Sequence, residues 1–196
     1  MIVYVGSEKG GVGKTTTVFM LALYIMNNYD VPLKLIDSDI KQQSLFKLME
    51  LRKKNKLDYV DVIVGGDLKD IKPNELVLID GRANIQEVDS EYLNKCDLVL
   101  ITTSDSFLEI ENTKSFIKVL EKNNIPYKIL FTRVEDKKSV DVLKNEFKNV
   151  LKTVVGYSDR YRKIGINGET DLDNFSVYKW HTKRELENIL NELFSK

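Results

Sequence analysis

The chain has 196 residues, of which 42% are hydrophobic and 31% charged, and its formal net charge is zero. This hydrophobic fraction is enough to bury a core and excludes an intrinsically disordered chain. The balanced charge gives no general support for nucleic-acid binding, yet residues 122–184 hold 14 Lys and Arg against 8 Asp and Glu. A local basic patch and a set of scattered solvated lysines are equally compatible with that excess.

The expected elements alternate between strands and helices along the chain. The segments expected as strands are 2–5, 33–37, 59–64, 76–80, 98–101, 127–131 and 153–155, and the segments expected as helices are 17–26, 43–55, 88–94, 107–122, 140–150, 160–164 and 179–194. Segments 76–80 and 98–101 are continuous apolar runs, which is typical of buried parallel strands. The alternation predicts an α/β fold, in which a doubly wound, mostly parallel sheet carries helices on both faces and binds ligands at the carboxyl ends of its strands. We expect residues 1–196 to form one domain.

A glycine-rich loop lies between the first expected strand and the first expected helix, and residues 9–16 read KGGVGKTT. Glycines let the backbone curl so that successive N–H groups point at an anion, and the following helix N-terminus adds partial positive charge. In such a loop Lys14 would reach the β- and γ-phosphates of a nucleotide, and the Thr15 hydroxyl would ligate Mg²⁺. The candidate nucleotide-binding residues here are Gly10, Gly11, Val12, Gly13, Lys14, Thr15 and Thr16. The alternative is a glycine turn with an accidental Lys-Thr pair.

The loop departs from the general phosphate-loop pattern, which requires a glycine where Glu8 stands, and it carries an additional lysine, Lys9. The spelling KGGVGKTT resembles the deviant Walker A motif of the ParA/MinD family of dimeric ATPases. In that family the first lysine crosses the dimer interface to phosphates bound by the partner subunit. The resemblance therefore implies a P-loop ATPase that forms a homodimer on binding ATP, with Lys9 acting in trans. Without the motif around it, Lys9 would be an ordinary solvated lysine.

Aspartates end two of the expected strands, at Asp37-Ser38-Asp39 and at Asp80. In this type of sheet such positions face the phosphate loop, where a carboxylate can hold Mg²⁺ or orient water. Asp80 resembles the Walker B aspartate. Asp37 and Asp39 resemble the family's Asp-x-Asp segment, so Asp37 is expected near the metal and Asp39 is expected to position the hydrolytic water. Lys9, Lys14 and Asp39 are thus the catalytic candidates, and Thr15, Asp37 and Asp80 the metal candidates. The alternative for Asp37 and Asp39 is a turn or a helix N-cap.

The second half of the chain offers weaker signals. Thr132 and Arg133 end an expected strand, at a place that lies beside the adenine in ParA/MinD proteins. Residues 158–163 occupy the place of a short arginine-containing helix in ParF-like proteins, where they could contact the base, a partner subunit or DNA, or form a solvated face. We expect Trp180 and His181, the only histidine, to be packing residues.

The small ParF-like plasmid partition proteins resemble this chain in length and in the Asp80-Gly81 pair. The resemblance implies a weak Mg²⁺-dependent ATPase that is cytoplasmic and nucleoid-associated. Its ATP-bound dimer would bind DNA without sequence preference and would act with a ParB-like centromere-binding partner. Two alternatives stay open: a MinD-like ATPase that positions a cargo or binds a membrane, and an ATP-dependent small-molecule synthetase. Acidic residues (Glu185, Glu187 and Glu192) flank the apolar stripe of the last helix, so we expect no stable membrane association.

Overall fold

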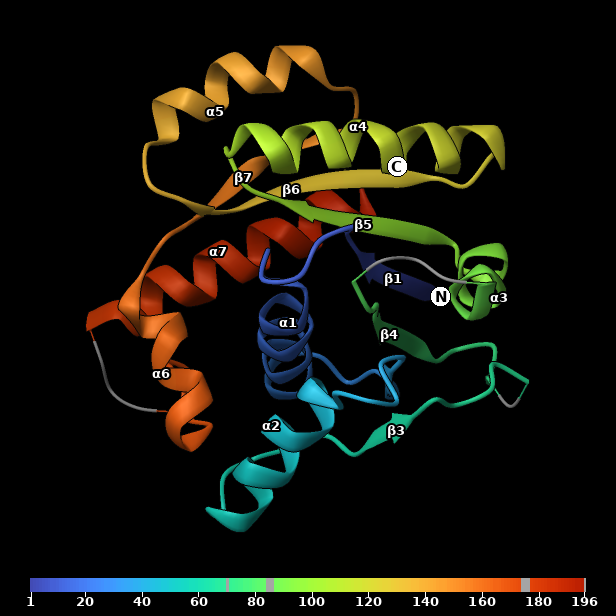
Figure 1. The fold of residues 1–196 in the computed structure, drawn as a ribbon. Coiled ribbons are helices and arrows are strands. Elements are labelled where there is room, and N and C mark those ends of the chain that lie inside the picture. The colour runs from blue at the N-terminus through green and yellow to red at the C-terminus, as the bar shows by residue number, and fades with distance from the viewer. Residues whose placement is uncertain (70, 84–86, 174–176, 196) are drawn as a thin grey trace.

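The computed structural model describes residues 1–69, 71–83, 87–173 and 177–195. Within these residues, seven strands form one sheet in the order β3-β2-β4-β1-β5-β6-β7, and every neighbouring pair is parallel (Figure 1). The strands are β1 (Ile2–Gly6), β2 (Leu33–Asp37), β3 (Val62–Val64), β4 (Leu76–Asp80), β5 (Leu98–Thr103), β6 (Tyr127–Val134) and β7 (Val150–Gly156). The predicted doubly wound parallel sheet is confirmed.

Helices cover both faces of the sheet (Figure 1). One face carries α1 (Lys14–Asn28), α2 (Ser44–Lys54), α6 (Asp159–Asn167) and α7 (Val177–Phe194), and the other carries α3 (Glu87–Lys95), α4 (Phe107–Lys122) and α5 (Lys137–Leu143), which a 3₁₀ turn (Lys144–Glu146) follows. Strand β1 shows how the two cores form, since Val3 and Val5 face the first group of helices while Tyr4 faces the second. Among the helices described, none is long and apolar enough to cross a bilayer.

Three expectations about local structure are wrong. The segment 59–64 contributes only Val62–Val64 as a strand. The helix expected over 140–150 ends at Leu143, and Val150 already begins the edge strand β7, because Asn149 turns the chain with a positive φ of 59°. Trp180 and His181 do not pack in the core, since both are exposed and their rings contact each other edge to face.

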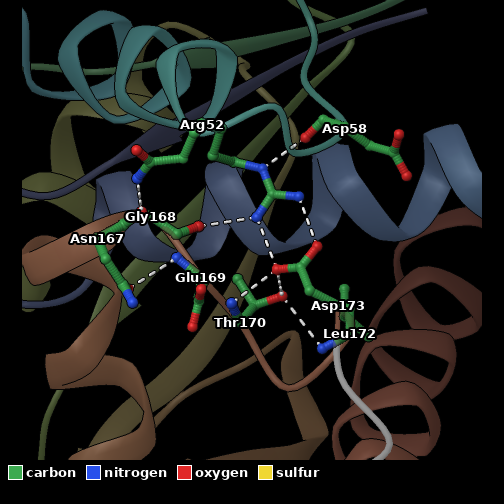
Figure 2. A network of polar contacts seen from close by, with 9 residues as sticks. Arg52, Asp58, Asn167, Gly168, Glu169, Thr170, Leu172 and Asp173 are labelled. Atoms are coloured by element: carbon green, nitrogen blue, oxygen red, sulfur yellow. Dashed lines mark hydrogen bonds and ion pairs between the residues drawn. The ribbon is translucent and has the colours of Figure 1, made fainter.

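A buried arginine joins α2 to the segment that follows α6 (Figure 2). Arg52 is 0% exposed, and its two terminal nitrogens donate to the carboxylate oxygens of Asp173 over 2.7 and 2.6 Å. Arg52 also donates to the carbonyl oxygens of Asp58 and Gly168. Burial opposes ionisation of Asp173, but hydrogen bonds from Arg52 and Thr170 outweigh it and hold the pKa of this carboxyl below its ordinary value. The network fixes the chain that leads from α6 toward α7.

Candidate functional site

The strand register brings the glycine loop and the strand-end aspartates together. Strand β4 lies between β1 and β2, and Asp80 is in register with Val5 on one side and with Asp37 on the other. The loop follows β1 directly, so residues 9–16 lie beside both carboxylates. This is the edge of the sheet where parallel α/β folds bind their ligands.

The loop has the backbone conformation that an anion-binding turn requires. Gly13 lies in the left-handed region with φ of 85°, and a Cβ at this position would lie 3.3 Å from Thr132 Oγ1. Helix α1 begins at the next residue with no side-chain cap and no acidic residue in its first turn. The first N–H groups of a helix have no partner within the helix, so this end of α1 can receive a negatively charged group.

Lys14 points back into the loop. Its side chain is buried, and Nζ donates to Ser7 Oγ over 2.9 Å and to the carbonyl oxygen of Lys9 over 2.8 Å. Burial lowers the pKa of Lys14, and the nearby carboxylates of Asp80 and Asp39 oppose that shift. The ammonium group thus lies in the concave side of the loop and is balanced by the two aspartates.

Asp80 has the character of a metal ligand. Its side chain is 4% exposed, and its Oδ1 atom is buried and accepts no hydrogen bond from any described residue. The pKa of Asp80 is raised to about 7: burial is the largest cause and the charges of Asp37 and Asp39 add to it, while a hydrogen bond from Thr15 and the charge of Lys14 oppose the shift. A buried carboxylate oxygen without a donor, next to a threonine hydroxyl, is a donor set that suits Mg²⁺. The residues present therefore fit this ion.

Asp37 and Asp39 organise the start of α2. The Oδ2 atom of Asp37 accepts from the backbone N–H groups of Leu45 and Phe46 over 3.0 and 3.2 Å, and its Oδ1 atom accepts from Asp39 N. Burial raises the pKa of Asp37 despite these hydrogen bonds. Asp39 closes a turn, since its Oδ1 atom accepts from the backbone N–H groups of residues 41 and 42. Asp39 thus forms a turn and Asp37 binds the first N–H groups of α2, as the alternative interpretation of this segment expected. The charges of both carboxylates also raise the pKa of Asp80.

Lys9, Thr132 and Arg133 contact the loop or its neighbours. Lys9 is exposed, and its Nζ lies 3.6 Å from Glu109 Oε1 at the start of α4. The buried Thr132 hydroxyl donates to the carbonyl oxygen of Val12 over 2.7 Å, and Arg133 donates to the carbonyl oxygen of Gly11. The sequence assigned Thr132 and Arg133 to a nucleotide base; here they hold the backbone of the loop, and they also line the cavity beside it.

That cavity has a volume of about 480 Å³ and extends from the loop to β7, α6 and α7. Tyr161 on α6 and Glu185 on α7 line its far wall, and the Tyr161 hydroxyl donates to Glu185. Burial first, and then the charge of Glu185, raise the pKa of Tyr161. The sequence pointed to residues 158–163 but not to Glu185, because an acidic residue beside an apolar stripe reads as solvent-facing. The side chains of Arg162 and Lys163 lie outside the described part of the structure.

Comparison with known proteins gives one family. Residues 3–170 match the CobQ/CobB/MinD/ParA nucleotide binding domain. Among curated proteins, none matches the sequence significantly.

Several solved structures share the fold. A protein of Borrelia burgdorferi B31 described as a plasmid partition protein, bound to AMPPNP, superposes with a TM-score of 0.74 at 17% identity and covers 98% of this chain and 97% of its own. MinD from Pyrococcus horikoshii, complexed with Mg-ADP, gives 0.75 at 15% identity, with 98% and 96% covered. An ATP complex of Cyanothece McdA gives 0.73 at 16% identity, with 100% and 96% covered. At these identities the likeness establishes the fold.

Proposed function

The chain belongs to the CobQ/CobB/MinD/ParA nucleotide-binding family, and from that premise we propose that it is a Mg²⁺-dependent ATPase that segregates DNA as a partition protein. The observation that carries the proposal is the meeting of the KGGVGKTT loop with the buried, donor-free oxygen of Asp80. A phosphate loop and a metal-binding carboxylate are the two parts that P-loop phosphoryl transfer requires.

Each residue of the site has a role in this proposal. Lys14 exchanges its contacts with Ser7 and Lys9 for the phosphates, and the N–H groups of residues 10–16 surround them. Thr15 and Asp80 hold Mg²⁺, which when bound neutralises charge on the β- and γ-phosphates. Asp39 orients the attacking water, and Asp37 keeps the Asp39 turn in place through its hydrogen bond to Asp39 N.

Lys9 is the residue through which a second subunit would enter the site. Its exposed amine forms a weak ion pair with Glu109, so it can leave that carboxylate at small cost. We propose that two ATP-bound subunits face each other across their loops and that each Lys9 reaches the phosphates held by the other subunit. The homodimer then forms only with ATP, and hydrolysis dissolves it.

The proposed cargo is DNA, which the ATP-bound dimer binds without sequence preference before a ParB-like, centromere-bound partner stimulates hydrolysis. The plasmid partition protein of Borrelia supports this choice. The alternative of membrane binding through α7 is less well supported, because Leu186, Ile189, Leu190 and Leu193 are each at most 4% exposed and pack in the core. An amphipathic helix binds a bilayer through an apolar face that is free to insert.

Binding to random-sequence duplex DNA tests the proposal, measured with ATP, with ADP and without nucleotide at several salt concentrations. We expect binding with ATP alone, and an affinity that falls as salt rises, because phosphate contacts release counterions. Mg²⁺-dependent ATP hydrolysis is measured on the same protein. Hydrolysis without DNA binding in any nucleotide state would leave an ATPase but contradict the partition role.

A further inference from the structure

A second concave surface lies at the free edge of the sheet. It has a volume of about 890 Å³ and is lined by residues of the edge strand β7, of α5 with its 3₁₀ turn, of α6 and of α7. Figure 1 shows α5 and α7 on opposite sides of β7. We call it the β7 groove. Its backbone edge is already occupied, since Glu192 accepts from the N–H groups of Lys152 and Thr153, and Lys144 donates to the carbonyl oxygen of Lys152. An added β-strand is therefore an unsuitable occupant, and side chains must recognise whatever binds.

The side chains of the β7 groove favour an anionic ligand. Lys144, Lys152, Arg160 and Arg184 line it. Three acids line it too: Glu185 pairs with Arg160 over 3.4 Å, so these two charges balance, and Glu192 accepts from the β7 backbone but keeps its negative charge. Asp141 is the third acid, so Lys144, Lys152 and Arg184 exceed the carboxylates of Asp141 and Glu192 by one charge. The excess of cations places part of the basic second half of the sequence on one surface.

Exposed aromatic rings stand beside these cations on the first turns of α7. Residues 178–184 read YKWHTKR, with no acidic residue. Tyr178 is 60% exposed and Trp180 is 61% exposed, and the guanidinium of Arg184 lies 5.3 Å from the centre of the Trp180 ring. Exposed aromatic rings next to cations are the groups that stack on sugars and bases while lysines and arginines bind phosphates.

We propose that the β7 groove is the surface that binds the sugar-phosphate backbone of nucleic acid, with Lys152 and Arg184 on phosphates and with Trp180, which lies beside Arg184 outside the groove lining, against a sugar or base. This inference rests on the proposed DNA-binding function and names the surface that performs it. An anionic bilayer is a poorer occupant, because Leu186, Ile189, Leu190 and Leu193 of α7 are buried in the core and the groove is concave and polar.

The test compares Lys152→Ala/Arg184→Ala and Trp180→Ala with a control of equal charge change, Lys118→Ala/Lys122→Ala, whose two exposed lysines lie on α4. Affinity for random-sequence duplex DNA is measured by fluorescence anisotropy with ATP from low to moderate salt. The groove double variant should bind at least tenfold more weakly and lose about two units of salt slope, since each phosphate contact contributes roughly 0.9. Trp180→Ala should weaken binding about tenfold with the slope unchanged, because a stacking ring releases no counterion.

The possible results distinguish a failure of the groove inference from a failure of the proposed partition function. Affinity for a fluorescent ATP analogue should be the same in all variants, which shows that the nucleotide site is intact. If the wild-type protein binds DNA and both Lys152→Ala/Arg184→Ala and Trp180→Ala bind it as the α4 control does, the β7 groove is the wrong surface and the partition role stands. If the wild-type protein binds no DNA but binds vesicles of anionic lipid through the same residues, both the groove inference and the partition role are overturned.

Discussion

The fully buried Arg52 allows a quantitative prediction about stability. Asp173→Asn keeps the shape of the side chain but removes the charge that balances the guanidinium, which is 0% exposed and held over 2.6 and 2.7 Å (Figure 2). Removing one partner of a buried ion pair costs about 3–5 kcal/mol, because the other charge remains buried. Asp173 keeps 13% of its side-chain exposure, so we expect the lower end, about 3 kcal/mol. For a chain of this length, that lowers Tm by roughly 6–12 °C.

Urea unfolding without nucleotide, with thermal melts alongside, measures the effect. Asp58→Asn is the matched control, because Arg52 contacts only the backbone carbonyl of Asp58 (Figure 2). Arg52→Met/Asp173→Leu should lose less stability than Asp173→Asn, since it leaves no unpaired charge. The pKa of Asp173 is lowered by folding, so its contribution is present above its unfolded pKa of about 3.9 and is lost as the pH falls through the folded value. A loss below 1 kcal/mol at neutral pH for Asp173→Asn would refute the reasoning.

Three further predictions concern the nucleotide site. The pKa of Asp80 is raised to about 7, so the stability that its protonated form provides is present below the unfolded pKa and is lost as the pH rises through 7. Asp80→Asn should therefore raise the free energy of unfolding by up to about 4 kcal/mol at pH 8 in EDTA, and should give no gain at pH 4. Lys9→Ala should bind a fluorescent ATP analogue normally but form no ATP-dependent dimer, and unchanged dimers in light scattering would contradict the trans role. Asp39→Ala should retain nucleotide binding while its steady-state turnover falls at least 100-fold; full activity would remove its assigned role.

The elements that the sequence predicted well are those set by local patterns. Strands β4 and β5 are buried along their whole length, and each begins with an unbroken run of four apolar residues. The glycine loop is equally local, because the positive φ of Gly13 and the start of α1 follow from adjacent residues. The meeting of Asp37 with Asp80 could be inferred as well, since parallel strands bring their carboxyl ends to one edge.

Contacts between residues that lie far apart in the chain could not be predicted from the sequence. Arg52 lies on the buried face of α2 with Leu45 and Met49, but its partner Asp173 is 121 positions away. Trp180 was expected in the core because large aromatic residues usually bury their rings, and the sequence could not show that Arg184, one helical turn on, contacts the exposed ring. The edge strand β7 was predicted too short, because Val150 was assigned to the preceding helix and Lys152 interrupts the apolar pattern.

The nucleotide cavity and the β7 groove share one wall. Glu185 lines both, and it accepts from Tyr161 on the cavity side and from Arg160 on the groove side. Arg160 Nε is buried and has no acceptor among the described residues. Moving the Glu185 carboxylate would therefore remove acceptors from a guanidinium that already lacks one. A ligand that moves Tyr161 or competes for Glu185 therefore changes how far Glu185 balances the positive charge of Arg160 at the groove. Because coupling between two binding sites is reciprocal, DNA should raise the affinity for ATP by the same factor by which ATP raises the affinity for DNA, and Glu185→Gln should reduce both factors together.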